Sequence, residues 1–511
     1  MALSHAHPHA ATPGIFLSPT EKLNLTTWSY SFDDISISTR VLTPFWDFCA
    51  YLVPDNVAPN LLSLSGLLCV LHAYYLCYRY MDDYPSAVSI CAMLLIFMYQ
   101  TLDAIDGKHA RRIRNASPLG ELFDHSCDAI SCVFVALTVC AVLGIENLKS
   151  RWFVTQFFQL AFLSSHFEAF KSRVVHFGAF TGPGEAIFLF ECTMLVRATI
   201  GWDWIRRPFE TVVLPILTPL HPTLYDMDSL QLFALMMCYL YYSALLFMVI
   251  KVLTMPRKNY STRNGLLFCL LIRYVPAFLI QLNLLASELS ILEIICDGLF
   301  MSILTSDLIL AKMSQRELHP WIVVFAMISL FNSFVLLAVV VFYYVAVFYD
   351  IAQHLNIPVF STVTNVYVDG VYDMCHIGHI NQFYNALKHG NKLIVGVLSD
   401  ESVMDYKRKP IMTCEERCAI VRKLSMVHKV IPKTIYPTIT EEFIKEHNIH
   451  IVCHSEEYDK PDDTYYTIPR KMGMTRVLPR TEGMSTSELI KRMTTRAYEI
   501  GKENVEKLDD K

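Results

Sequence analysis

We expect no cleavable signal peptide, because the first 25 residues are polar and are interrupted by Pro8 and Pro13. We therefore expect the first apolar segment to insert as an internal anchor. Three histidines alternate over residues 5–9, but nothing nearby completes a metal coordination shell. Residues 1–27 are accordingly expected to form a disordered tail.

Two further absences limit the class of protein. The formal net charge of the 511 residues is only -5, and the basic residues lie in short clusters rather than in one stripe, which argues against a nucleic-acid partner. The 15 cysteines form neither a disulfide framework nor the paired CxxC words of a zinc site. Many of them lie in apolar stretches, where a thiol packs as a small hydrophobic group. We expect a reduced, cytosol-facing setting.

Apolar residues are abundant instead. Hydrophobic residues make up 53% of the sequence and the mean hydropathy is +0.35, which is typical of membrane proteins. Nine apolar runs are each long enough to cross a hydrocarbon core of ~30 Å, so we expect a multi-pass α-helical membrane domain of eight to ten spans. The runs lie near residues 57–80, 86–105, 121–144, 152–170, 183–202, 228–254, 264–286, 288–312 and 319–351.

Other stretches set the placement of these runs in the membrane. Residues 28–54 mix aromatic and charged residues at helical spacing, which predicts an amphipathic helix on the membrane surface. Residues 209–220 are a candidate for a short re-entrant piece. The densest basic clusters, at 108–115, 206–207 and 257–263, are expected on the cytosolic side by the positive-inside rule.

The composition changes near residue 360. Strand-length apolar words (VYVDG, KLIVGVLS, KVIPKT, HIVCHS) then alternate with helical stretches, which predicts a cytosolic α/β Rossmann-like domain that binds a nucleotide at the carboxyl ends of its strands. The chain is therefore divided into a tail (1–27), a membrane domain (28–360) and a cytosolic domain (361–511).

Four aspartates stand out within the apolar sequence. Each of two expected helices carries a pair one turn apart, so all four side chains can converge. A carboxylate at membrane depth costs at least ~2.5 kcal/mol, and a cation must therefore sit among them. Hard oxygen ligands suit magnesium or manganese. Salt bridges to the loop that follows are the alternative. The acids are Asp103, Asp106, Asp124 and Asp128, and the loop bases are Lys108, Arg111, Arg112 and Arg114.

The spacing of these aspartates is also a signature. Residues 103–128 match D-x2-D-G-x2-A-R-x8-G-x3-D-x3-D, and they resemble the CDP-alcohol phosphotransferase family. The words VAPNLLSLSG and SPLGELFDHSCD are similar to those of eukaryotic choline/ethanolamine phosphotransferases. The resemblance implies transfer of phosphocholine or phosphoethanolamine from its CDP ester to diacylglycerol, with release of CMP.

The resemblance also implies roles for individual residues. The four aspartates would bind two divalent ions, Mg²⁺ or Mn²⁺. The small residues Gly107 and Ala110 would let the CDP pyrophosphate approach the helix backbone closely. The guanidinium of Arg111 would hold a phosphate. Asn60 would contact the nucleotide.

The base that takes the proton of diacylglycerol has two candidates, His125 and Asp128. An imidazole suits this task at neutral pH, whereas an aspartate already bound to a dication is a weak base. We favour His125, although the wider family often credits the last aspartate. Glu185 begins an apolar run and either contacts the headgroup, orients the base or acts as an interfacial cap.

The second domain carries the words DMCHIGH at 373–379 and PRTEGMSTSEL at 479–489. Placed after a strand and before a helix, they resemble the choline- and ethanolamine-phosphate cytidylyltransferases. The reaction implied joins CTP, with Mg²⁺, to a phosphorylated amino alcohol and gives the CDP ester and pyrophosphate. The attacking phosphate is already an anion, so no base is needed.

The resemblance assigns the residues of this second site. His376 and His379 would stabilise the developing negative charge as donors at a helix N-terminus. Lys407 and Arg480 would grip phosphates. The remaining nucleotide and substrate contacts would be Asp369, Gly370, Arg417, Thr481, Ser485 and Thr486.

The identity of the amino alcohol is left open by the sequence. Aromatic faces hold a quaternary ammonium best, and Tyr436 stands where choline-specific relatives usually show tryptophan. The word HSEEYDK supplies carboxylates that can accept hydrogen bonds from a primary ammonium, which favours ethanolamine. Tyr436 together with Tyr458 or Tyr465 would also build a choline cage. The residues of this word that we single out are His454, Glu456, Glu457 and Tyr458.

These observations predict a bifunctional phospholipid-synthesis enzyme of the endoplasmic reticulum or Golgi, with both active sites facing the cytosol. A homodimer is expected from the family. Two other interpretations remain: the membrane half is an anchor or sensor for a cytidylyltransferase, or the chain is a transporter with carboxylates along its path. The complete set of aspartates favours the enzyme.

Overall fold

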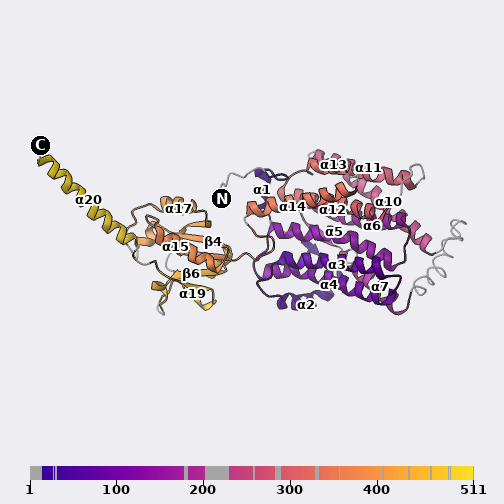
Figure 1. Cartoon of the computed structure of the whole chain (residues 1–511), viewed down its shortest axis with the longest axis horizontal. Helices are drawn as coiled ribbons and strands as arrows, with labels where there is room; N and C mark the ends of the chain where they lie inside the picture. The colour runs from indigo at the N-terminus through magenta and orange to yellow at the C-terminus, as the bar shows by residue number, and fades with distance from the viewer. Residues whose placement is uncertain are drawn as a thin grey trace. The chain divides into compact units, whose positions relative to one another are not determined.

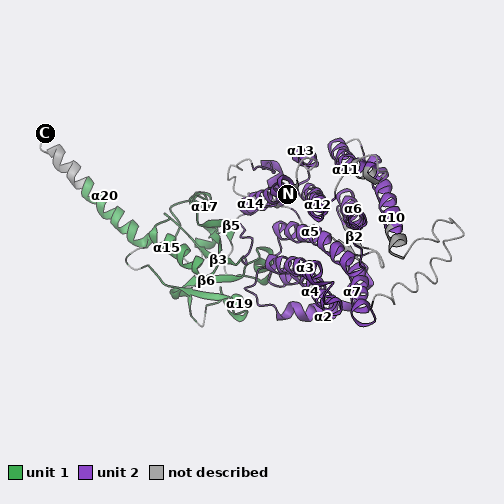
Figure 2. Cartoon of the chain, turned by 45° about the vertical axis from the view of Figure 1, so that its right-hand side comes forward, with its two compact units in different colours: residues 1–9, 363–511 green, residues 10–362 purple. Residues whose placement is uncertain are grey.

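The computed structural model describes residues 14–26, 28, 32–177, 182–201, 229–256, 259–281, 289–328, 333–355, 357–404, 408–434, 438–460, 463–481, 483 and 485–509. These residues divide into two compact units, one ending at Thr362 and the other beginning at Val363 (Figure 2). The expected re-entrant piece at 209–220 lies outside the described residues.

The first unit is mainly helical (Figure 1). Among its described residues, two short strands pair in parallel. Every apolar run of the sequence contains a helix, and the last run contains two. Its elements are α1 (Pro19–Thr26), β1 (Phe32–Asp34), α2 (Ile37–Leu52), α3 (Pro59–Tyr80), α4 (Pro85–Arg112), α5 (Pro118–Val142), α6 (Leu148–Ser172), β2 (Val175–Phe177), α7 (Pro183–Thr199), α10 (Ser229–Leu253), α11 (Tyr260–Gln281), α12 (Ile291–Ser314), α13 (Pro320–Ile328) and α14 (Ser333–Leu355).

Six helices of this unit are long and apolar enough to cross a membrane, counted over the described part of the chain: α3, α4, α5, α10, α12 and α14. The most deeply buried is α12, which packs against α5, α6 and α14. Its start is fixed by a capping box, in which the Ser290 hydroxyl accepts a hydrogen bond from the Glu293 backbone N–H at 3.2 Å. The prediction of a multi-pass helical membrane domain is confirmed, with six such helices in the described part of the chain where the sequence predicts eight to ten spans.

The expected disordered tail is wrong for residues 14–26. Phe16, Leu17 and Leu25 are almost fully buried, and burial of apolar side chains stabilises this segment against the helices. Lys22 of α1 lies 3.8 Å from Asp350 of α14, which adds a buried ion pair. Contacts with distant helices therefore order a stretch whose local sequence predicts no ordered structure.

The surface helix expected over residues 28–54 is shorter than predicted. It begins at Ile37, because the segment Phe32–Asp34 pairs with Val175–Phe177 as a parallel strand. Apolar side chains on α2 remain exposed, with Val41 at 69% and Tyr51 at 75%. This exposure agrees with a helix that lies at the membrane surface.

The second unit is a five-stranded parallel sheet in the order β5-β4-β3-β6-β7, which confirms the Rossmann-like prediction. Alternate residues of β3 face opposite sides: Val366 and Val368 join one buried cluster, and Tyr367 joins the other. The strands are β3 (Asn365–Gly370), β4 (Lys392–Leu398), β5 (Val427–Thr434), β6 (Ile451–Ser455) and β7 (Thr475–Leu478). The helices are α15 (Ile377–Ala386), α16 (Asp400–Met404), α17 (Cys414–Arg422), α18 (Glu441–Glu446), α19 (Thr467–Lys471) and α20 (Thr486–Asp509).

The strand order predicts where a binding crevice lies, next to the carboxyl ends of β3 and β6. Strands β4 and β6 lie on either side of β3, so the chain leaves β3 and β6 toward opposite halves of the sheet. Ligands of open α/β sheets bind at this switch point, outside the carboxyl ends of the strands. The word DMCHIGH follows β3 directly, so its side chains reach this crevice.

Candidate active sites

Four aspartates from α4 and α5 meet in the first unit. The carboxyl group of Asp103 lies within hydrogen-bonding reach of those of Asp124 and Asp128, and that of Asp106 lies within reach of Asp124. The helical spacing of these residues predicts this convergence. The two helices therefore create one concentrated patch of carboxylate oxygens.

Neighbouring side chains hold the aspartates in place. The hydroxyl of Ser63, on α3, donates a hydrogen bond to Oδ2 of Asp106. The phenol of Tyr99 donates to Oδ1 of Asp128 at 3.0 Å. Sequence reasoning missed both donors, because each lies in an apolar run outside the motif. They orient the carboxylates and leave other oxygens free to bind a ligand.

This donor set fits divalent cations. Oδ1 of Asp124 is buried and accepts no hydrogen bond from the residues that the structure describes. Ligand atoms of Asp124, His125 and Asp128 all lie within 4.8 Å of one another. A buried carboxylate without a partner is costly, and a hard cation with oxygen ligands removes that cost.

The alternative is that the loop bases form salt bridges with the four motif aspartates. The two loop bases for which the structure gives ion pairs, Lys108 and Arg112, have other partners. Nζ of Lys108 lies 2.7 Å from Oδ1 of Asp47, and the guanidinium of Arg112 lies 2.9 Å from Oδ1 of Asp55. Both aspartate partners come from the segment before α3. Lys108 and Arg112 are thus paired with aspartates other than the four of the motif.

A cavity of about 590 Å³ opens beside the aspartates. Arg111 fills the space next to Gly107, since a Cβ built on this glycine would lie 3.3 Å from a terminal nitrogen of the guanidinium. The Asn60 amide donates to the Val359 carbonyl at 2.9 Å. The residues on this wall that the sequence predicts for the site are Asn60, Asp106, Gly107, Ala110, Arg111, Asp124 and His125.

The two candidates for the base, His125 and Asp128, lie close to each other. Nδ1 of His125 lies 3.8 Å from Oδ2 of Asp128, and the side chains are 12% and 18% exposed, respectively. The His125 ring packs edge to face against His166 of α6, with ring centroids 5.3 Å apart. Because His125 lines the cavity, it can reach a hydroxyl bound there.

Glu185 does not line this cavity. Its Oε1 accepts a hydrogen bond of 2.9 Å from the Ser38 backbone N–H in the first turn of α2. A carboxylate at a helix N-terminus satisfies an otherwise unpaired donor. The structure therefore agrees with the cap among the three roles considered for Glu185.

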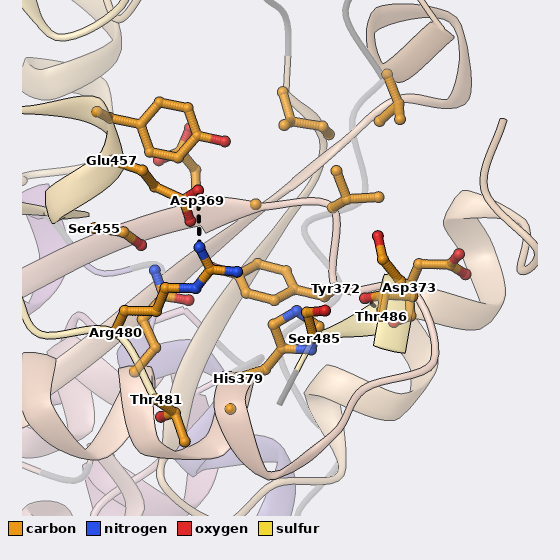
Figure 3. A pocket seen from close by; sticks show the side chains of 18 of the residues that line it. Asp369, Tyr372, Asp373, His379, Ser455, Glu457, Arg480, Thr481, Ser485 and Thr486 are labelled. Atoms are coloured by element: carbon orange, nitrogen blue, oxygen red, sulfur yellow. Dashed lines mark hydrogen bonds and ion pairs between the residues drawn. The ribbon is translucent and has the colours of Figure 1, made fainter. Parts of the chain in front are cut away.

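The second unit has a pocket of about 680 Å³ at the carboxyl ends of β3 and β6 (Figure 3). It joins the two words that the sequence places far apart. Most of the residues predicted for this site line the pocket: Asp369, Gly370, His376, His379, Arg480, Thr481, Ser485 and Thr486.

The two histidines are fixed at the start of α15. Nδ1 of His376 accepts a hydrogen bond from the Gly378 backbone N–H at 3.1 Å, and the rings of His376 and His379 stack with centroids 4.0 Å apart. Burial lowers the pKa of His376, so the ring is neutral near pH 7. With Nδ1 as acceptor, the proton lies on Nε2, which can donate to a phosphate.

A carboxylate and several tyrosines form another wall of this pocket. Oδ1 of Asp369 accepts a hydrogen bond from the phenol of Tyr466 at 2.7 Å. Burial raises the pKa of Asp369, and the hydrogen bonds of Tyr465 and Tyr466 oppose that rise. Sequence reasoning did not assign Tyr466 to the site, because only the fold brings it against β3.

Arg417 lies outside this pocket, which corrects its expected role as a nucleotide contact. Its side chain is fully buried and donates to the carbonyls of Val371, Leu398 and Met412 and to Asp400. These bonds use the guanidinium to join loops after β3 and β4. Arg417 is thus a structural residue of the second unit.

Three other predicted residues need comment. His454 is 1% exposed and stacks behind Tyr466, with ring centroids 4.6 Å apart, so it supports the pocket wall without lining it. Lys407 and Tyr436 lie outside the described residues.

Comparison with known proteins agrees with this division. Residues 56–218 match the family CDP-alcohol phosphatidyltransferase, and residues 367–492 match the family Cytidylyltransferase-like. The chain is similar to Choline/ethanolaminephosphotransferase 2 of Arabidopsis thaliana, at 30% identity over 52% of this chain and 67% of the relative. It is also similar to Cholinephosphotransferase 1 of Gallus gallus, at 36% identity over 37% of this chain and 58% of the relative.

A relative from Dictyostelium discoideum is named Uncharacterized CDP-alcohol phosphatidyltransferase class-I family protein 3. It is 35% identical over 38% of this chain and 51% of its own length. The chain thus spans about half the length of this relative and of two further relatives from the same organism.

Proposed function

The chain belongs to the CDP-alcohol phosphatidyltransferase family, and from this membership we propose that it is a bifunctional enzyme of phospholipid synthesis. The second unit makes CDP-ethanolamine or CDP-choline from CTP and the phosphorylated amino alcohol. The first unit then transfers phosphoethanolamine or phosphocholine to diacylglycerol and releases CMP. The observation that supports the proposal is that each unit has its own pocket, and that most of the residues expected for the corresponding reaction line it.

In the second unit, the phosphate of the amino alcohol attacks the α-phosphorus of CTP, and the bond to pyrophosphate breaks. Nε2–H of His376, with His379 beside it, faces the negative charge that develops there. The backbone N–H groups at the starts of α15 and α20 add favourable dipoles. Thr486 and Ser485 supply donors at the start of α20, which lines the same pocket.

In the first unit, Asn60 and Arg111 bind the CDP ester in the cavity beside the aspartates. His125 takes the proton of the diacylglycerol hydroxyl, whose oxygen attacks the β-phosphorus while the bond to CMP breaks. Asp128 is the alternative base. Divalent cations bound by Asp103, Asp106, Asp124 and Asp128 would supply positive charge that stabilises the pyrophosphate as its charge grows.

The protein is integral to a membrane, and we place it in the endoplasmic reticulum or Golgi with both sites facing the cytosol. The basic cluster at 108–115 follows the motif helix and supports this orientation. A homodimer remains a proposal from the family.

The test is a reaction with purified full-length protein in detergent, supplied with Mg²⁺, diacylglycerol, labelled CTP and phosphoethanolamine or phosphocholine. The CDP ester and the labelled lipid are counted separately. We expect both products. Formation of the CDP ester without any lipid, from the substrates or from added CDP ester, would support a cytidylyltransferase with a membrane anchor instead.

A further inference from the structure

We infer that Glu457 makes the second unit selective for an amino alcohol whose nitrogen carries hydrogens, so that phosphoethanolamine is used in preference to phosphocholine. The inference rests on the proposed cytidylyltransferase function and names its substrate class. Glu457 lies two residues after the end of β6. It lines the same pocket as Asp369 and the two histidines, His376 and His379.

Two of the tyrosines that line this pocket, Tyr465 and Tyr466, are arranged as hydrogen-bond donors. The phenol of Tyr466 donates to Asp369 at 2.7 Å, and Tyr465 also bonds this carboxylate. His454 stacks on the Tyr466 ring with centroids 4.6 Å apart and planes 29° apart, and the edge of Tyr465 packs against the same ring at 4.8 Å. A trimethylammonium needs open aromatic faces. Among the described tyrosines, Tyr465 and Tyr466 turn their hydroxyls to the site and use ring surface for packing.

The carboxylate of Glu457 already binds an N–H cation. A guanidinium nitrogen of Arg480 lies 3.7 Å from Oε2 of Glu457, and Figure 3 shows this guanidinium reaching toward the wall that holds Asp369 and Glu457. A primary ammonium also offers N–H donors, three of them, whereas a trimethylammonium offers none. The wall is therefore suited to a cation that donates hydrogen bonds.

Arg480 also has a second partner in the proposed reaction, the phosphates of CTP. When the guanidinium turns to a phosphate, the Glu457 carboxylate is left facing the pocket without its cation. An ammonium that reaches this wall takes the place of the guanidinium and can form a charge-assisted hydrogen bond with Glu457, which is about twice as strong as a neutral one. Glu457 thus stabilises bound phosphoethanolamine through a hydrogen bond that phosphocholine cannot form.

The test compares full-length wild type, Glu457→Gln and the control Glu456→Gln. The sequence also makes Glu456 a candidate ammonium contact, but Glu456 is exposed and does not line the pocket, so the structure removes it from that role. It therefore matches the chemistry of the change at a neighbouring position outside the site. Initial rates of CDP-ester formation are measured with phosphoethanolamine and phosphocholine, and binding of each is measured by calorimetry. The side chain of Glu457 is 52% exposed, so its replacement leaves the fold intact.

We expect wild type to favour phosphoethanolamine in kcat/KM. Glu457→Gln should lower that preference by about 5- to 20-fold, mainly through KM, since charged hydrogen bonds are partly weakened by solvent at such exposure. Glu456→Gln should not change it. A preference of wild type for phosphocholine, or an equal effect of Glu457→Gln on both substrates, would overturn the inference. Absence of turnover with either substrate would overturn the proposed function, and calorimetry would still decide whether phosphoethanolamine binds selectively through Glu457.

Discussion

Oγ1 of Thr486 lies 3.4 Å from Nε2 of His376, although 110 residues separate the two in the chain. The same hydroxyl donates to the Asp373 carbonyl at 3.3 Å. The first residue of α20 is therefore fixed against the start of α15, where His376 and His379, the histidines that we propose to be catalytic, lie. This contact joins the two words that identify the nucleotide site.

Replacing Thr486 tests this contact. Thr486→Val keeps the shape of the side chain and removes the hydroxyl, so Nε2 of His376 loses a polar neighbour. We expect kcat for CDP-ester formation to fall about tenfold, because a hydrogen bond contributes about 1 kcal/mol and a barrier higher by about 1.36 kcal/mol slows a reaction tenfold. Transfer from added CDP ester to diacylglycerol should stay unchanged.

Thr495→Val serves as the control for this variant. Thr495 is also on α20 but is exposed and bonds only within the helix, to the Lys491 carbonyl at 3.0 Å. An equal loss of rate in both variants would mean that the helix, and not the hydroxyl at its start, carries the effect.

Ser63 should control the cation affinity of the first unit. Its hydroxyl donates to Oδ2 of Asp106, so Ser63→Ala removes a bond that orients a cation ligand. Loss of such outer partners typically costs 10- to 100-fold in metal affinity. We expect the Mg²⁺ concentration for half-maximal transfer to rise by about tenfold, as measured by titrating Mg²⁺ in the transfer assay.

Ser65→Ala is the matched control, because the Ser65 hydroxyl is exposed and bonds to the Leu61 carbonyl of its own helix. The assignment of Asp106 to cation binding would be contradicted if Ser63→Ala left the Mg²⁺ dependence unchanged while the protein remained folded.

Arg417 should be required for stability of the second unit. Arg417→Met keeps most of the buried volume but leaves Asp400 and three carbonyls without their donor. The Asp400 side chain is 39% exposed, so water can solvate it, and most of the cost comes from the carbonyls that lose their donor. Leaving a buried acceptor unpaired costs about 1–3 kcal/mol, so the unfolding midpoint should fall markedly in a thermal melt. Lys423→Ala, at an exposed site just after α17, should have little effect. A melt of Arg417→Met equal to that of wild type would restore Arg417 as a candidate for nucleotide contact.

The Arg417 pair also predicts a dependence of stability on pH. Burial alone would raise the pKa of Asp400, but hydrogen bonds from Arg417 and the Cys414 backbone N–H hold this pKa below its usual value. A depressed pKa stabilises the fold above the unfolded value of about 3.9, and this contribution is lost as the pH falls through the folded value. Between pH 6 and pH 3, wild type should therefore lose more stability than Asp400→Asn in melts monitored by circular dichroism. Equal losses would contradict the pairing.

Local periodicity accounts for what the sequence predicted well. The aspartates of α4 and α5 converge because a helix places residues three or four apart on one face. Alternating strand and helix words similarly predicted the parallel sheet, and DMCHIGH after β3 predicted the place of its pocket.

Long-range packing accounts for what the sequence did not predict. Arg417 lies in a stretch that resembles a nucleotide contact of the family. Its N–H groups instead donate to the carbonyls of Val371, Leu398 and Met412, which only the fold brings together. Residues 14–26 are ordered by helices far along the chain, including α14 through Asp350. Glu185 bonds to Ser38 across a separation of 147 residues, which no local pattern reveals.

The most direct test of the account uses two variants, His376→Ala and Asp124→Ala, with labelled CTP, phosphoethanolamine, diacylglycerol and Mg²⁺. His376→Ala should form no CDP ester but should still make lipid from added CDP-ethanolamine, and Asp124→Ala should do the reverse. Mixing the two variants should restore labelled lipid. If either variant lost both partial reactions while folded, or if the mixture made no lipid, two independent sites in one chain would be contradicted.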